Sequence, residues 1–191
     1  IPAPQVLPLL QPLGAAEGLA SVEYAPCLSL MATYETLPEV LLLDHGLGWH
    51  ISADHSVLSW LSLDSSKYLN RLADPIVLLQ SQAGFADQYL RRLDTLVPDR
   101  VAMEALLNET AAQMLTAAAT IGPGLDQPQS QRLHRGRYSV VSQHHGDTRF
   151  KTQWTSLVCC GDWCTTDDTT NLEAAHRSGR AAAALIKTAV S

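Results

Sequence analysis

The sequence predicts a mixed α/β (α+β) fold, in which a largely antiparallel sheet and its helices are followed by a last strand and a long C-terminal helix. Three observations predict it. Short runs rich in Leu, Val, Ile, Ser and Tyr lie between Pro, Gly and Asp residues, two later segments have helical periodicity, and the chain ends in an alanine-rich stretch. With 191 residues, 46% hydrophobic and 17% charged, the chain is long and apolar enough to bury a core.

The first part of the chain is predicted to consist mainly of strands. Residues 1–13 contain four prolines, at Pro2, Pro4, Pro8 and Pro12, and are interpreted as the end of a strand that runs into a proline-punctuated turn. Apolar and β-branched runs bounded by turn residues predict further strands at residues 24–35, 56–64 and 75–82.

Two helices are expected to follow these strands. Residues 84–96 and 99–120 have apolar side chains at helical spacing, and Pro98 stands where a helix start tolerates proline. The Gly- and Pro-rich residues 122–131 predict a loop, which is the clearest internal boundary of the chain. Beyond it, strands are predicted at residues 132–142, 148–152 and 155–160, and a helix at residues 172–190.

The charge balance excludes several classes of partner. The formal net charge is −6 with only 13 Lys and Arg residues and no visible basic face, so neither nucleic acid nor an anionic membrane surface is an expected partner. The longest charge-free stretches, residues 1–16 and 110–125, are shorter than the roughly 20 residues of a membrane span. The N-terminus has no basic leader and no initiator Met, so we expect no signal peptide and a sequence that begins at a cut. The cysteines, interpreted below as reduced thiols, are consistent with the expected cytoplasmic location.

The cysteines leave three interpretations open: buried structural thiols, a redox pair or a metal site. They are Cys27, Cys159, Cys160 and Cys164. Cys159 and Cys160 are adjacent in a strand-like run, where successive side chains point to opposite faces and cannot readily bind one ion together. We favour reduced structural thiols, as is usual in the cytosol. The adjacent His144 and His145 have no second ligand cluster, so they are interpreted as surface residues and no metal site is expected.

The most specific pattern lies in residues 155–186. An apolar strand stops at Gly161, an acidic residue follows at Asp162, a polar loop intervenes, and a helix starts near Asn171. Glycine lets a backbone approach a ligand closely, a carboxylate accepts hydrogen bonds from sugar-like hydroxyls, and a helix N-terminus offers unpaired N–H groups and a positive dipole end. The pattern therefore suits a cofactor that carries hydroxyl groups and a partial negative charge.

The helix that follows is predicted to press closely against a sheet, because small residues cover a whole side of it. These residues are Ala174, Ala175, Ser178, Gly179, Ala182 and Ala183. Its basic residues, Arg177, Arg180 and Lys187, lie beyond the first turn, so the N-terminus of the helix stays positive and uncrowded.

Three runs of this segment together resemble the C-terminal FAD-binding motif of the flavin-dependent amine oxidase superfamily. They are Cys160-Gly161-Asp162-Trp163, Asn171-Leu172-Glu173-Ala174-Ala175 and Ser178-Gly179-Arg180-Ala181-Ala182. Within the superfamily, the renalase-like NAD(P)/FAD-dependent oxidoreductases look most similar.

Weaker similarities extend over nearly the whole chain. Residues 1–5 resemble the end of a strand in the FAD domain, and Asp64-Ser65-Ser66-Lys67 resembles a strand-end motif of the substrate domain. His134-Arg135-Gly136-Arg137-Tyr138 resembles the His-Arg-Trp-Arg-Tyr run that leads back toward the flavin.

The resemblance implies a two-domain flavoenzyme. Residues 1–14 would end a segment of a Rossmann-like FAD-binding domain, residues 15–131 would form the substrate-binding domain, and residues 132–191 would return to the FAD-binding domain. The implied cofactor-binding residues are Gly161, Asp162, Trp163, Asn171, Leu172, Glu173 and Ala174. Asp162 would bind the ribityl chain of FAD, and the backbone at the helix start would face the flavin ring near N1 and the C2 carbonyl.

The implied reaction removes a hydride from a C–H bond beside nitrogen in a small-molecule substrate, either an amine or a dihydronicotinamide nucleotide. Molecular oxygen would reoxidise the flavin. The resemblance identifies no catalytic residue and no oligomeric state.

Three features depart from the family pattern. The GxGxxG turn that should hold the ADP half of FAD is absent from these residues. We therefore expect these residues, which would begin mid-domain at Ile1, to be the second half of a larger enzyme. Gly136 takes the place of the family's tryptophan, and Ala174 replaces a glycine that is usual in the first turn of the helix. These two changes bear on the shape of the substrate pocket and of the flavin contact.

Two hypotheses from other classes stay beside the flavoenzyme. One is a non-catalytic α+β binding module that has kept the scaffold without the cofactor. The other is a redox-active thiol protein built on Cys159, Cys160 and Cys164. Hydrolase chemistry has no support, because no Ser-His-Asp order and no HExxH pattern occurs.

Overall fold

The structure, a computed structural model of the 191-residue chain, describes residues 1–14, 18–36, 50–52, 55–64, 74–152, 157–167 and 171–190. The chain divides into two compact units. Unit 1 consists of Ile1–Ala25 and Tyr138–Ser191, and unit 2 of Pro26–Arg137. Both boundaries fall inside strands, namely β1 (Glu23–Thr33) and β5 (Ser130–Gln143).

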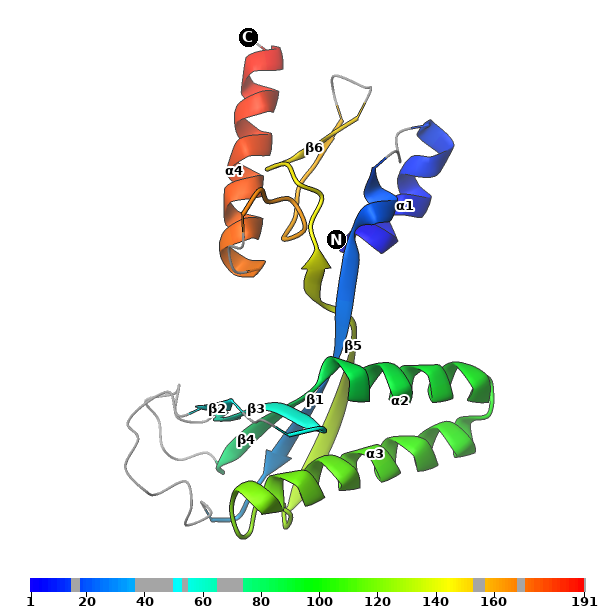
Figure 1. The fold of residues 1–191 in the computed structure, drawn as a ribbon, viewed down its shortest axis with the longest axis vertical. Helices are drawn as coiled ribbons and strands as arrows, with labels where there is room; N and C mark the ends of the chain where they lie inside the picture. Colours follow the sequence, from blue (N-terminus) through cyan, green and yellow to red (C-terminus); the bar gives the residue numbers. More distant parts are fainter. Residues whose placement is uncertain are drawn as a thin grey trace. The chain divides into compact units, whose positions relative to one another are not determined.

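Unit 2 is built on a sheet with the strand order β2-β3-β4-β1-β5 (Figure 1). The additional strands are β2 (His50–Ser52), β3 (Leu58–Leu63) and β4 (Ile76–Ser81). The pairs β2–β3, β3–β4 and β4–β1 are antiparallel. The prediction of a largely antiparallel sheet is confirmed, and β1, β3 and β4 correspond to the strands expected at residues 24–35, 56–64 and 75–82.

Two helices pack on one face of this sheet. They are α2 (Ala83–Leu96) and α3 (Arg100–Ile121), which lie side by side in Figure 1 and match the two predicted helices. Leu30 and Leu61 are both register partners of Leu79, and all three belong to the core that the helices cover. The Asp99 carboxylate caps α3 by accepting hydrogen bonds from two backbone N–H groups at 3.1 Å.

Other residues of the same strands are less buried, because alternate side chains of a strand point to opposite faces. Met31 pairs with Leu78, and Trp60 pairs with Gln80. Met31 is 36% exposed and Trp60 is 37% exposed. Trp60 is therefore not a core residue of unit 2, and it contributes to a half-exposed sheet face.

Residues 3–13 of unit 1 form helices, so the predicted strand end is wrong. Helix α1 spans Ala3–Leu10 and continues into the 3₁₀ helix η1 (Gln11–Leu13). Pro2 and Pro4 stand at the helix start, where no N–H is needed, and Ala3, Val6 and Leu10 form the buried stripe. The sequence-based prediction missed the helical spacing of these buried residues because four of the thirteen residues are prolines.

The rest of unit 1 surrounds a second core. It contains the 3₁₀ helix η2 (Leu19–Ser21), the antiparallel pair β6 (Phe150–Lys151) and β7 (Val158–Cys159), and helix α4 (Asn171–Val190). Val6, Leu19, Phe150 and Trp163 are buried together there. Among the described helices of both units, none is long and apolar enough to cross a membrane.

Candidate functional site

A tight turn after β7 contains Gly161, Asp162 and Trp163. The backbone N–H of Cys164 donates to the Gly161 carbonyl at 3.1 Å and closes the turn. Trp163 is fully buried, and its Nε1 donates to the carbonyl oxygen of Ile1 at 3.2 Å. A Cβ atom at Gly161 would collide with Trp163 Nε1 and would lie 2.8 Å from Trp163 Cδ1. Glycine is therefore needed at this position because the indole fills the space of a side chain.

The indole of Trp163 lies in an aromatic cluster of unit 1. The ring centroids of His145 and Phe150 are each 6.1 Å from that of Trp163. The backbone N–H of His145 also donates to the Trp163 carbonyl at 2.9 Å. His144 and His145 are half-buried, which corrects the prediction that they are surface residues. The Trp163 side chain thus anchors the turn in the core of unit 1.

Asp162 has one engaged and one available carboxylate oxygen. The Tyr24 hydroxyl donates to Asp162 Oδ1 at 3.1 Å. Among the described residues, no donor reaches Oδ2. The side chain is half-buried, so water is only partly excluded from it. This carboxylate can still accept hydrogen bonds from a ligand.

Tyr24 is well suited to remain a hydrogen-bond donor. Burial, and then the negative charge of Asp162, raise the pKa of Tyr24 well above its ordinary value. The phenol consequently stays protonated throughout the physiological range. Its ring packs edge-on against Tyr138, with the centroids 5.8 Å apart.

Helix α4 contacts the turn through a buried stripe of small side chains. Ala174, Ser178 and Ala182 form its buried stripe, and the Gly161 N–H donates to Ser178 Oγ at 3.2 Å. The small-residue side is narrower than predicted, because Ala175 and Gly179 are half-buried and Ala183 is exposed. Ala174 is buried, so its methyl group takes no space on the exposed side of the helix start.

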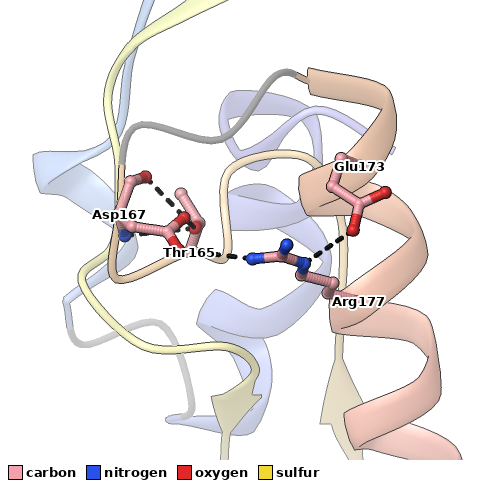
Figure 2. Close-up of polar contacts among 4 residues, drawn as sticks. All are labelled: Thr165, Asp167, Glu173 and Arg177. Atoms are coloured by element: carbon pink, nitrogen blue, oxygen red, sulfur yellow. Dashed lines mark hydrogen bonds and ion pairs between the residues drawn. The ribbon is translucent and has the colours of Figure 1, made fainter.

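A polar network joins the segment after Trp163 to the first turns of α4, as Figure 2 shows. The Thr165 hydroxyl donates to Asp167 Oδ1 at 2.8 Å. Arg177 pairs with Asp167 at 3.3 Å and with Glu173 at 2.7 Å. All three charged side chains are about half exposed, so the network contributes little to stability. Its consequence is electrostatic: Arg177 compensates the charge of Glu173 at the helix start.

The first turn of α4 contains the other residues predicted to bind the cofactor. Asn171 is half-buried, Glu173 is exposed, and Leu172 is 84% exposed. Residues 168–170, which precede the helix, lie outside the described residues. A large apolar side chain is thus presented at a positive helix end.

Cys159 and Cys164 have the properties of structural thiols, whereas Cys160 is exposed. All four are free, and Cys164 is buried against Ser178. Burial raises the pKa of Cys164 to about 12, and burial also raises the pKa of Cys159. Because the thiolate is the reactive form, both groups are poor nucleophiles at neutral pH. These properties weaken the redox-thiol hypothesis.

Two of the weaker motifs, at residues 64–67 and 134–138, contribute less to a site. In the His134–Tyr138 stretch of β5, Arg137 forms an ion pair with Asp94 of α2 at 2.7 Å. Its charge is therefore used within unit 2. In the Asp64–Lys67 stretch, only Asp64 lies among the described residues.

Unit 2 has an open pocket of about 490 Å³ beside α3. Its carboxylate, unlike that of Asp162, is fully hydrogen-bonded within the protein. The pocket is lined by His55, Val57, Glu109, Ala112, Gln113, Thr116, Ala117 and Thr120. Both oxygens of Glu109 accept hydrogen bonds from Arg92, at 3.0 and 2.9 Å. This bonding holds the pKa of Glu109 below its usual range. Its carboxylate is satisfied within the protein.

Sequence reasoning located the turn and the helix but missed the residues that position them. Tyr24 was not linked to Asp162, because 138 positions separate the two. Ser178 was noted only for its small size. No local spacing could have revealed either contact.

A comparison with known protein families and with curated proteins finds no match to this chain.

Proposed function

We propose that this chain contributes the flavin and substrate sites of an FAD-dependent oxidoreductase of the renalase-like amine oxidase kind. The observation that carries the proposal is the Asp162 carboxylate. It lies on a tight turn between β7 and α4, with Oδ1 held by Tyr24 and Oδ2 without a described donor. The ribityl chain of FAD carries the hydroxyl groups that such an acceptor binds. Unit 1 would then belong to a Rossmann-like FAD-binding domain.

The start of α4 supports the same proposal. The first N–H groups of a helix have no acceptor within it, and the helix dipole makes this end positive. Arg177 is shared between Glu173 and Asp167, so it offsets part of the acidic charge near this helix end. The backbone here would stabilise negative charge near N1 and the C2 carbonyl of a reduced flavin. Leu172 would cover an edge of the ring, and the buried Ala174 methyl would leave the approach open.

When bound, FAD would accept a hydride from a C–H bond beside nitrogen and pass the electrons to molecular oxygen. The chain's own residues would bind and orient. Asp162 would fix the ribityl chain, and the substrate would be an amine or a dihydronicotinamide. No residue of this chain is assigned a proton-transfer role.

Flavin binding tests the proposal. The product of the complete reading frame that encodes these residues should be purified, and its absorbance recorded before and after addition of FAD. We expect flavin bands, and we expect Asp162→Ala to weaken FAD binding by roughly tenfold or more, because a charged hydrogen-bond acceptor is lost. Asp147→Ala is the matched control, since Asp147 lies in unit 1 and, among the described residues, its carboxylate is hydrogen-bonded only by its neighbours Thr148 and Arg149.

Two results would count against the proposal. A protein without flavin bands that takes up no FAD would leave the non-catalytic binding module as the better hypothesis. A protein that binds FAD equally well with and without the Asp162 carboxylate would remove Asp162 from the site.

A further inference from the structure

The contact between Tyr24 and Asp162 joins the beginning of the chain to its C-terminal motif. Tyr24 lies on β1, and its hydroxyl donates to Asp162 Oδ1 at 3.1 Å. The donor, the Tyr24 hydroxyl, lies outside the sequence motif that contains Asp162. It is also the one side-chain hydrogen bond that the Asp162 carboxylate makes among the described residues.

The bond restricts how the carboxylate can rotate. A half-exposed aspartate with no partner samples several orientations, and a ligand must then pay the entropy of selecting one of them. With Oδ1 held by Tyr24, the position of Oδ2 is fixed before a ligand arrives. Tyr24 is itself held in the strand and against the Tyr138 ring at 5.8 Å.

We propose that Tyr24 is a positioning residue, which holds Asp162 so that Oδ2 is presented to the ribityl hydroxyls of FAD. This inference rests on the proposed function, because it needs Asp162 to bind the flavin. It assigns Tyr24 no contact with the reacting atoms. Its effect on a ligand passes entirely through Asp162.

The competing explanation is that the bond only tethers the turn to β1. The two explanations differ in what happens when Asp162 is already absent. A positioning residue has no further effect on FAD affinity once the carboxylate is gone, whereas a general loss of packing weakens binding in either background. A double-mutant cycle on the dissociation constant of FAD therefore separates them.

The experiment uses the product of the complete reading frame, stripped of flavin and titrated with FAD. The four proteins are the natural sequence, Tyr24→Phe, Asp162→Ala and the double variant. We expect Tyr24→Phe to weaken binding by about 3- to 10-fold, which is the net effect of a typical hydrogen bond, because Tyr24 acts on the ligand only through Asp162. In the Asp162→Ala background, the same change should alter the dissociation constant by less than about twofold.

Tyr138→Phe is the matched control. It removes the same hydroxyl from the adjoining ring, and Tyr138 makes no described side-chain hydrogen bond to Asp162. We expect it to leave FAD affinity within about twofold of the natural protein. Urea unfolding of each variant, without flavin, should show whether any change in affinity follows a loss of stability.

The outcomes separate this inference from the proposed function. If the natural protein binds no FAD, both fall. If Asp162→Ala weakens binding but Tyr24→Phe does not, only the role of Tyr24 is overturned. Equal effects of Tyr24→Phe in both backgrounds, or equal effects of Tyr24→Phe and Tyr138→Phe, would also overturn it and leave the role of Asp162 standing.

Discussion

Replacement of Gly161 by alanine tests the turn that carries the candidate site. The added Cβ would collide with Trp163 Nε1 and lie 2.8 Å from Trp163 Cδ1. The indole is fully buried, so it cannot swing into solvent without leaving the core. The turn or the ring must shift, and the hydrogen bond from Nε1 to Ile1 is then lost.

The cost follows from these contacts. Overpacking of a buried site costs about 1–3 kcal/mol, and the lost hydrogen bond adds about 1 kcal/mol. We expect Gly161→Ala to lower the free energy of unfolding of unit 1 by about 2–4 kcal/mol, measured by urea denaturation followed by circular dichroism. Gly179→Ala is the control. A Cβ there meets nothing within 4 Å, so alanine should stabilise α4 by about 0.5–1 kcal/mol.

A second change locates the clash. Replacing the indole by a smaller side chain with Trp163→Leu should remove most of the loss in unfolding free energy that Gly161→Ala causes. The effects of the two substitutions on that free energy should therefore be strongly non-additive. If Gly161→Ala is tolerated as well as Gly179→Ala, the indole does not occupy that space. The steric explanation for Gly161 would then be refuted, and a close approach to a ligand would be the better reason for glycine.

Two further predictions concern titratable groups. Tyr34 donates to the Leu125 carbonyl at 2.6 Å, and burial followed by the charge of Asp126 raises its pKa from 10.0 to about 12. Because the pKa of Tyr34 is raised in the folded state, its contribution to stability is complete below pH 10 and is lost as the pH rises toward 12. Tyr34→Phe should therefore reduce the decrease in the stability of unit 2 between these pH values. An unchanged decrease would contradict this role of Tyr34. Thiol labelling at pH 8 should modify the exposed Cys160 rapidly and the buried Cys164 only in urea, and equal rates would show that Cys164 is accessible.

The sequence predicted those elements whose pattern is local. Helices α2, α3 and α4 lie within a few residues of their predicted bounds, because apolar spacing and the start signal at Pro98 are local features of the sequence. The strands β1, β3 and β4 were found for the same reason. Helix α1 was missed because its prolines suggested a broken strand, although Pro2 and Pro4 stand where a helix start accepts them.

The unit boundaries could not be predicted from local signals. The Gly- and Pro-rich loop at residues 122–131 suggested a boundary, but the chain crosses between units at Pro26 and Arg137, inside β1 and β5. A strand that passes from one core to another keeps its extended pattern throughout. The point at which the strand passes from one unit to the other depends on which residues, distant in sequence, pack against each part of it.

The predicted cofactor residues divide into two groups when their contacts are compared. Gly161, Trp163 and Ala174 are explained by packing within unit 1, since an indole or the core occupies the space around each. Asp162 and the exposed Leu172 are not explained in this way, because folding leaves a carboxylate oxygen and a large apolar side chain without a described partner. The first group would be retained by a binding module without cofactor, so its presence does not favour catalysis. The flavin hypothesis therefore depends on the second group, and ligand titration rather than fold stability is the measurement that decides between enzyme and module.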